Sequence, residues 1–369
     1  MRILFTCNPL FGHLNPMLPL ACAALAAGHD VVVATGADMT PLAQREGLAT
    51  WPVGMTHAQA GGNTQASWLD YFEAGASRRM APLATRCAAW RPDLVVHEET
   101  ELAGPVVAAT TGARALVHGL SPMPPLRLLP WFAAAIDRLA PVGASNSVLD
   151  AWRASAYLEL CPRALSPVQD RIWSDVVPLR PMTPGRTEDP ARARRIEQMP
   201  RAPTVFVTLG TVYSDNTAAL RAAVEGVMGL GVNVIVAIGA QGDDSLMGLQ
   251  GERVLVERLV PLASVLQRCT AVVSQGGSGI MLGALAQALP QLMLPQGADQ
   301  FRNAELCAPT GAALALTPAD ATPAAVGSAV RRLLDDGRHA RAARVVADEI
   351  AAMPDAAAVI AALTANTER

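Results

Sequence analysis

The sequence contains no lysine: all 29 of its basic residues are arginine. A mechanism that needs a lysine Schiff base is therefore excluded. Basic and acidic residues nearly balance, with a formal net charge of −3, so nothing in the charge suits nucleic acid or an anionic membrane as a partner. Aromatic residues make up only 4% of the chain, so any local gathering of them is informative.

Cysteine is also scarce. The six cysteines include no C-x-x-C pair and lie among apolar neighbours, which favours buried free thiols and gives no sign of a zinc site. No apolar run is long enough to cross a bilayer. Residues Met1–Phe5 have the pattern of a first strand and not of a secretory signal. These features predict a soluble, cytoplasmic protein.

Strands alternate with helices along the whole chain, whose 369 residues are enough for two domains. Apolar strands are expected at residues 2–6, 30–34, 94–97, 115–118, 204–208, 233–238, 254–256, 271–274 and 291–294. Helices are expected at residues 16–27, 39–46, 103–111 and 218–228, and within 324–363. Continuous apolar strands separated by helices predict parallel sheets that are covered on both faces.

The fold class is therefore predicted to be α/β, with two doubly wound domains facing each other across a cleft. Prolines and a glycine in residues 176–185 are typical of an interdomain connector. We expect an N-terminal domain (1–180), a linker (181–202) and a C-terminal domain (203–350). A C-terminal helix (351–369) could pack back on the N-terminal domain. Ligands of such sheets bind outside the carboxyl ends of the strands.

The most informative motif is a glycine-rich turn, Gln275-Gly276-Gly277-Ser278-Gly279, which follows a strand and opens a helix. Its backbone N–H groups would lie at the positive end of the helix dipole, where a phosphate can sit. Leu209-Gly210-Thr211 ends another strand of the same sheet and could donate to the same phosphate. Asp299-Gln300 could bind sugar hydroxyls. Together these groups suit a nucleotide-sugar, although each could also be only a turn or a solvated loop.

His13 follows the first strand, in Phe11-Gly12-His13-Leu14-Asn15-Pro16. An imidazole there could take a proton from a hydroxyl at neutral pH, or it could only hydrogen-bond to the start of the helix that Pro16 is expected to open. A base needs an orienting partner, and Glu98 or Glu99 follows another strand end. Neighbouring side chains point in different directions, so at most one of the two acids is expected to face His13.

Two apolar features could line binding sites. Pro261 cannot donate a hydrogen bond, so the backbone near Val260 could meet the edge of a nucleobase, or the pair could simply end a strand. Five aromatic residues fall in stretches that we expect to be irregular. They either pack under long loops or line an apolar acceptor pocket, and they are Trp68, Tyr71, Phe72, Trp131 and Phe132.

Taken together, the motifs resemble the family-1 glycosyltransferases of the GT-B fold, in particular bacterial enzymes that decorate antibiotics and other natural products. The resemblance runs from Met1 to about Leu363. It rests on Gly12-His13-Leu14-Asn15-Pro16, Pro92-Asp93-Leu94-Val95-Val96, Leu209-Gly210-Thr211, Val260-Pro261 and residues 269–307. It implies Rossmann-like domains and a metal-independent, inverting transfer, with His13 as the general base and Glu98 as its orienting acid. The glycine-rich turn and Thr211 would stabilise the departing diphosphate.

The resemblance also implies the substrates: a nucleotide-diphosphate sugar on the C-terminal domain and a small hydrophobic aglycone on the N-terminal one. No further cofactor is implied, and the chain could form a homodimer. Three positions depart from the family pattern. Gln275 replaces a histidine and brings no positive charge, and Leu259 replaces an aromatic residue. Gly283 replaces a glutamate that holds ribose hydroxyls, which favours a thymidine-diphosphate donor over a uridine-diphosphate donor, with a deoxysugar as the group transferred.

Two other functions stay open. Gln275 and Gly283 could mark a catalytically impaired homologue that serves as a partner or scaffold of an active transferase, and the architecture also suits a nucleotide-sugar epimerase. Retention of His13, Glu98 and Asp299-Gln300 argues against decay, because these residues could drift freely in a scaffold. A dinucleotide oxidoreductase is disfavoured, because no G-x-G-x-x-G follows the first strand.

Overall fold

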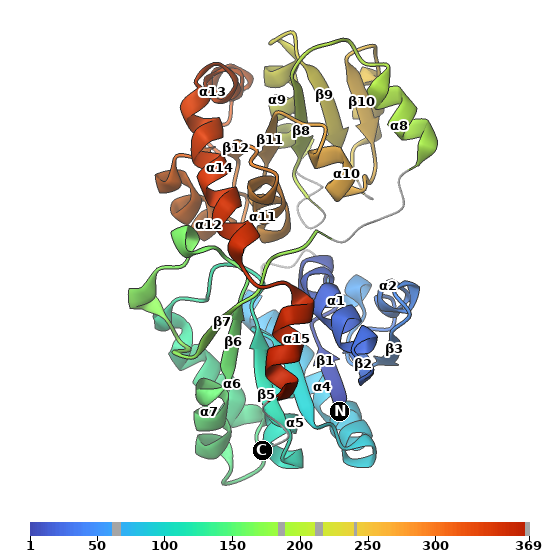
Figure 1. Cartoon of the computed structure of the whole chain (residues 1–369), viewed down its shortest axis with the longest axis vertical. Helices are drawn as coiled ribbons and strands as arrows, with labels where there is room; N and C mark the ends of the chain where they lie inside the picture. Colours follow the sequence, from blue (N-terminus) through green and yellow to red (C-terminus); the bar gives the residue numbers. More distant parts are fainter. Residues whose placement is uncertain (61–67, 184–188, 211–216, 240–241, 366–369) are drawn as a thin grey trace. The chain divides into compact units, whose positions relative to one another are not determined.

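The computed structural model describes residues 1–60, 68–183, 189–210, 217–239 and 242–365. They form two compact units, each built on its own sheet (Figure 1). The first unit comprises Met1–Cys161, Ser166–Arg180 and Met353–Arg369, and the second comprises Pro162–Leu165 and Pro181–Ala352. In the described part of the chain, no helix is both long and apolar enough to span a membrane.

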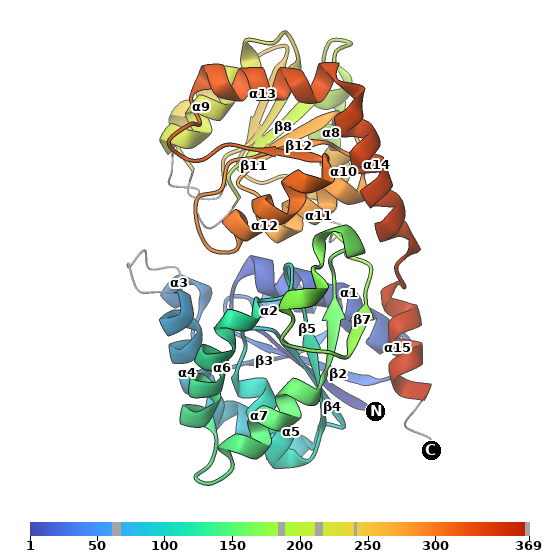
Figure 2. The same ribbon diagram turned by 90° about the vertical axis from the view of Figure 1, so that its left-hand side faces the viewer.

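The first unit is a seven-stranded parallel sheet with the strand order β3-β2-β1-β4-β5-β6-β7. Its strands are β1 (Arg2–Thr6), β2 (Asp30–Thr35), β3 (Ala49–Pro52), β4 (Leu94–Glu98), β5 (Arg114–His118), β6 (Ala156–Glu159) and β7 (Val176–Pro178). Its helices are α1 (Phe11–Ala26), α2 (Thr40–Arg45), α3 (His57–Ala60), α4 (Trp68–Trp90), α5 (Ala103–Thr111), α6 (Leu129–Leu139), α7 (Ser145–Ala154) and α15 (Ala356–Ala365). On one face α1 packs against α15, and on the other α4, α5, α6 and α7 pack together (Figure 2).

The second unit is a six-stranded parallel sheet with the order β10-β9-β8-β11-β12-β13. Its strands are β8 (Thr204–Thr208), β9 (Asn233–Ala237), β10 (Val254–Glu257), β11 (Ala271–Ser274), β12 (Gln291–Met293) and β13 (Ala313–Ala315). Its helices are α8 (Pro190–Glu197), α9 (Thr217–Met228), α10 (Leu262–Leu266), α11 (Ser278–Ala286), α12 (Gln300–Cys307), α13 (Pro323–Asp335) and α14 (Gly337–Ala352).

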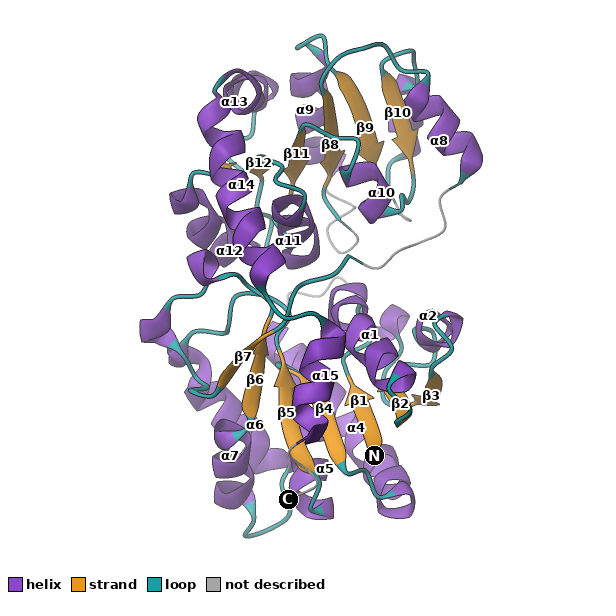
Figure 3. Ribbon diagram, viewed as in Figure 1, coloured by secondary structure: helices purple, strands orange, loops and turns teal. Residues whose placement is uncertain are grey.

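Both sheets are doubly wound, which confirms the predicted α/β class (Figure 3). In each unit the first strand, β1 or β8, lies between the second strand and the fourth, so the winding reverses there. The strands are buried on both faces because they consist of continuous apolar runs such as Ile3–Phe5 and Val205–Val207. The reversal between β1 and β4, and between β8 and β11, is where such sheets bind ligands.

Several predicted elements need correction. The stretch at 176–178, predicted to belong to a connector, forms β7, an edge strand whose last residue, Pro178, pairs with Glu159 of β6. A proline is tolerated there because it has no N–H to leave unpaired on the open side of the strand. The described part of 181–202, predicted to be a linker, groups with the second unit and includes α8. The aromatic residues expected in irregular stretches lie on helices, three on α4 and two on α6. The α4 pattern was obscured by Gly75 and Pro82, which usually interrupt helices.

Candidate active site

The switch point of the first sheet brings together the chain that leaves β1 and the end of β4. Thr6 pairs with His97, so the next residues of both strands emerge side by side. Helix α1 begins at Phe11, and the backbone N–H of His13 donates to the Leu10 carbonyl at 3.0 Å in its first turn. Pro16, expected to start this helix, lies inside it, as does Pro19, because the helix begins five residues earlier at Phe11.

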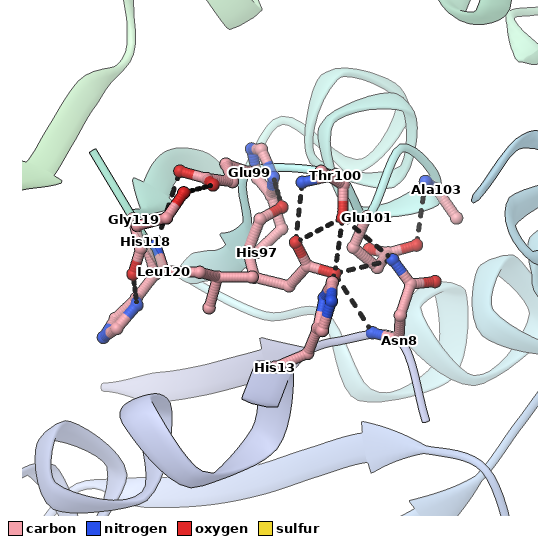
Figure 4. Close-up of polar contacts among 12 residues, drawn as sticks. Asn8, His13, His97, Glu99, Thr100, Glu101, Ala103, His118, Gly119 and Leu120 are labelled. Carbon is pink, nitrogen blue, oxygen red and sulfur yellow. Dashed lines mark hydrogen bonds and ion pairs between the residues drawn. The ribbon is translucent and has the colours of Figure 1, made fainter. Parts of the chain in front are cut away.

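His13 and Glu98 form the expected pair. The Nδ1 atom of His13 lies 2.9 Å from Oε1 of Glu98 (Figure 4). The carboxylate is fully buried, whereas the imidazole side chain is 15% exposed. Thr100 holds the other carboxylate oxygen, to which its backbone N–H donates at 2.6 Å and its hydroxyl at 2.9 Å. Glu98 is thus a fixed, dry acceptor, and His13 is the member of the pair that other molecules can reach.

The ionisation of Glu98 couples folding to pH. Burial by itself raises the pKa of Glu98, but the charge of His13 and the hydrogen bonds from His13 and Thr100 lower it from 4.5 to about 2. A carboxylate whose pKa is lowered by folding stabilises the folded state above its unfolded pKa, and that contribution is lost as the pH falls. We expect the free energy of unfolding to drop between pH 4.5 and 2 more steeply in the wild type than in Glu98→Gln, as measured by urea denaturation at each pH. Parallel curves for the two proteins would contradict this.

Glu99, the alternative partner, faces away from His13. It accepts a hydrogen bond from the Tyr157 hydroxyl at 2.6 Å and one from Ser121 at 3.2 Å. Burial raises the pKa of Glu99 well above its ordinary value. Because Glu98 is the last residue of β4 and Glu99 follows it, the two side chains point to opposite sides, and only Glu98 contacts the imidazole.

The predicted acceptor aromatics separate into two groups. The ring of Phe72 lies 5.5 Å from that of His13, centroid to centroid, and Trp68 stacks on Phe72 at 6.2 Å. Phe132, in contrast, is 1% exposed and packs on Trp152 in the core. Trp131 packs against the same core. Only the α4 aromatics are therefore brought to His13.

The switch point of the second sheet brings the two predicted phosphate-binding turns together. Ser274 of β11 pairs with Thr208 of β8, so Gln275 and Gly210 follow adjacent strand ends. Gly210 has a φ of +77°, which strains any other residue, and a Cβ there would also push the Gln275 amide away, because it would lie 2.1 Å from Nε2. Among the residues that the structure describes, the buried amide oxygen of Gln275 has no hydrogen-bond partner. Thr211, predicted to act with Gly210, lies outside the described residues.

The glycine-rich turn opens helix α11, as predicted, with Gly277 as the N-cap of the helix and Ser278 and Gly279 in its first turn. The Ser278 hydroxyl donates to Oδ2 of Asp299 at 2.7 Å, and Asn303 donates to the same oxygen at 2.8 Å. The predicted sugar-binding acid therefore contacts the predicted diphosphate turn. The side-chain oxygen of Gln300 accepts from the backbone N–H of Gln296, at 2.8 Å, and Gln300 is buried.

Two further positions bear on the nucleoside. Val260 is half-buried at the carboxyl end of β10 and packs against the core of this unit. Gly283 faces inward on α11, where an added Cβ would lie 3.0 Å from Oγ1 of Thr183 and 3.2 Å from Leu266. An added side chain at this position would therefore require Thr183 and Leu266 to shift by a few tenths of an ångström. Gly276, in the turn, has a φ of +79° and adjoins Met293.

Four polar neighbours of the His13–Glu98 pair were not found by sequence reasoning: Asn8, Arg79, Thr100 and Glu101. The sequence could have pointed to Thr100 and Glu101, because three acids between two apolar segments, in Glu98-Glu99-Thr100-Glu101, are unusual for a solvated turn. No sequence pattern singles out Arg79, because α4 holds other arginines, such as Arg78 and Arg86, and only tertiary packing distinguishes them.

Comparison with known proteins identifies the family. Residues 221–365 match a family model described as "Erythromycin biosynthesis protein CIII-like, C-terminal domain". The L-demethylnoviosyl transferase of Streptomyces niveus is 33% identical, over 99% of this chain and 98% of the relative. The chain is a member of the antibiotic-biosynthesis glycosyltransferases. The predicted resemblance is thereby confirmed.

Two more relatives place the glycosyltransferase within that family. The TDP-daunosamine transferase DnrS of Streptomyces peucetius is 29% identical, over 100% of this chain and 97% of the relative. The crystal structure of the glycosyltransferase SnogD from Streptomyces nogalater superposes with a TM-score of 0.79 at 27% identity, covering 99% of both chains. The two units thus have the GT-B fold. Among the described residues of this glycosyltransferase, no three His, Cys, Asp or Glu side chains form a group that could hold a metal ion.

Proposed function

We propose that this glycosyltransferase moves a deoxysugar, with inversion, from a thymidine-diphosphate donor to a hydroxyl of a small hydrophobic acceptor. The contact between His13 and Glu98 carries the proposal. With Nδ1–H of His13 donating to the ionised carboxylate, Nε2 of the neutral ring holds a lone pair that can accept the hydroxyl proton. The buried charge of Glu98 then stabilises the imidazolium that forms.

The proposed step is a single displacement. The acceptor oxygen forms a bond to the anomeric carbon of the sugar while the bond from that carbon to the diphosphate oxygen breaks. The hydroxyl proton passes to Nε2 of His13, and the bonding electron pair leaves with the diphosphate. Attack from the face opposite the leaving group inverts the anomeric centre. The aromatics beside His13, Phe72 and Trp68, offer an apolar surface for the acceptor.

The donor is proposed to bind at the switch point of the second sheet. Backbone N–H groups at the start of α11, with its dipole, suit the diphosphate. Gln275 would contribute a neutral amide, Val260 is proposed to meet the nucleobase, and Asp299 and Gln300 are proposed for the sugar. The name of DnrS, a TDP-daunosamine transferase, supports a thymidine-diphosphate donor. So does Gly283, which provides no side-chain acceptor for a ribose 2′-hydroxyl.

Thermal unfolding tests the choice of nucleotide. We expect thymidine diphosphate at about 100 times its Kd to stabilise the protein by about 2.7 kcal/mol, because a ligand of the folded state shifts the unfolding equilibrium. Uridine diphosphate at the same concentration should give a smaller rise in Tm. Protection by uridine diphosphate without protection by thymidine diphosphate would contradict the proposed donor.

Turnover by the isolated protein tests the reaction itself. The protein is incubated with a panel of thymidine-diphosphate sugars, with and without hydrophobic acceptors, and the products are identified by mass spectrometry and NMR of the new anomeric centre. Acceptor-dependent product with inverted configuration is expected. No product with any donor would favour the scaffold considered from the sequence, and donor conversion without an acceptor would favour the epimerase.

A further inference from the structure

A chain of buried polar groups extends from the Glu98 carboxylate through Asn8 to Arg79 and Glu101. Asn8 leaves β1 and is fully buried. Its side-chain nitrogen donates to Oε1 of Glu98 at 2.6 Å and to the Thr100 hydroxyl at 3.2 Å, and its backbone N–H donates to Oε1 of Glu98 at 3.3 Å. Oε1 of Glu98 therefore contacts both the His13 imidazole and the Asn8 side chain.

The orientation of the Asn8 amide is fixed by chemistry on both sides. Its oxygen accepts a hydrogen bond from Nη1 of Arg79 at 3.3 Å. A guanidinium has only donors and an ionised carboxylate has only acceptors. The amide oxygen must therefore face Arg79, and the NH₂ group must face Glu98. The reverse orientation would set donor against donor and acceptor against acceptor.

Arg79 is itself anchored. Its Nη1 also donates to Oε1 of Glu101 at 2.8 Å, and both side chains are fully buried. Glu101 in turn accepts from the backbone N–H groups of Ala103 and Gly104, at 2.9 and 2.8 Å, at the start of α5. A buried ion pair is an inefficient way to stabilise a fold. Here it connects two helices to the carboxylate that contacts the imidazole.

We propose that Asn8 is a positioning residue for the His13–Glu98 pair, holding Glu98 where it orients the imidazole, and that Arg79 sets the direction of the Asn8 amide. The inference rests on the proposed function, because it assigns Asn8 an effect on the proton-transfer step. Misplacement of a catalytic group by 1 Å can cost about 10²-fold in rate, so loss of the Asn8 donor should act on kcat. Donor and acceptor binding should change little, because Asn8 is buried behind the pair.

Two substitutions separate positioning from space filling. Asn8→Asp keeps the size of the side chain and an oxygen for Arg79, but it sets a second carboxyl group against Glu98. Two buried carboxyl groups that close share one proton, so Glu98 is no longer the ionised acceptor that orients His13. Asn8→Ala removes the whole group. We expect kcat to fall about 10²-fold in both variants, with Asn8→Asp no better than Asn8→Ala and both KM values near wild type. Near-normal kcat in Asn8→Asp beside an impaired Asn8→Ala would overturn the proposal.

A double variant tests the route through Glu98. If Asn8 acts by holding this carboxylate, Asn8→Ala should cause no further loss of kcat once Glu98→Ala is present. Multiplicative losses in the double variant would overturn the proposal. This cycle remains informative if Asn8→Asp does not fold, because it uses Asn8→Ala. All rates are expressed per folded protein, which is measured by near-UV circular dichroism.

A matched control uses another buried asparagine. Asn233 is 2% exposed, and its side chain donates to the Pro200 carbonyl at 2.8 Å in the other unit. Asn233→Asp should keep wild-type kcat per folded molecule. If His13→Ala is inactive while Asn8→Asp is fully active, only the role of Asn8 is wrong. If His13→Ala is active, the proposed function itself is wrong.

Discussion

His13→Ala should lower kcat by about 10² to 10⁴-fold, the range that a positioned general base contributes. The variant loses the nitrogen that is proposed to take the acceptor proton, and Glu98 is left with no imidazole to orient. Thymidine diphosphate should still raise the Tm as in the wild type, because the proposed donor residues lie in the other unit. Steady-state product formation and thermal unfolding measure the two effects.

A second histidine provides the control for this experiment. His29 precedes β2, where its ring contacts the N-terminal amine and no proposed site residue. His29→Ala should keep wild-type turnover. Near-normal turnover in His13→Ala would exclude this imidazole as the base, whatever the nucleotide experiment shows.

Arg79→Met should lower the free energy of unfolding by about 3–5 kcal/mol, because the substitution leaves Glu101 buried without its cation. That is a large fraction of the roughly 5–15 kcal/mol that stabilises a typical folded protein. Equilibrium urea denaturation, followed by circular dichroism, measures the loss. The double variant Arg79→Met with Glu101→Gln should recover part of it, because no unpaired charge then remains.

The neighbouring arginine is a matched control for this prediction. Arg78 is exposed on the same turn of α4, so Arg78→Met should change stability by less than about 0.5 kcal/mol. Equal losses in Arg78→Met and Arg79→Met would show that the effect belongs to the helix and not to the buried ion pair. An unchanged Arg79→Met would contradict the prediction directly.

The parts of the fold that could be predicted share one property: an apolar run with clear stops. The bounds of β1, β8 and β11 and of helix α5 agree with the prediction, because glycine, proline or polar residues flank each run. The short strands β3, β6, β7 and β13 were missed. Runs of three or four residues carry too little periodicity, and pairing with a neighbouring strand is what makes such a segment part of the sheet.

The candidate site was predictable where the chemistry follows directly from a strand end. His13, Glu98 and the glycine-rich turn fall into that class. The choice between Glu98 and Glu99 could not be predicted from the strand pattern, because it depends on the residue at which β4 ends. Phe132 was misassigned, because a core aromatic and a pocket aromatic look alike until Trp152 and Trp173 are seen to cover it.

Helix α15 follows the whole second unit in sequence but packs on α1, beside the first sheet. The first unit therefore cannot be completed during synthesis until every residue of the second has left the ribosome. Domains usually fold as units in the order of synthesis. In this chain the face of α1 that α15 covers stays exposed until the last helix is made, so removal of α15 should destabilise the helix that carries His13.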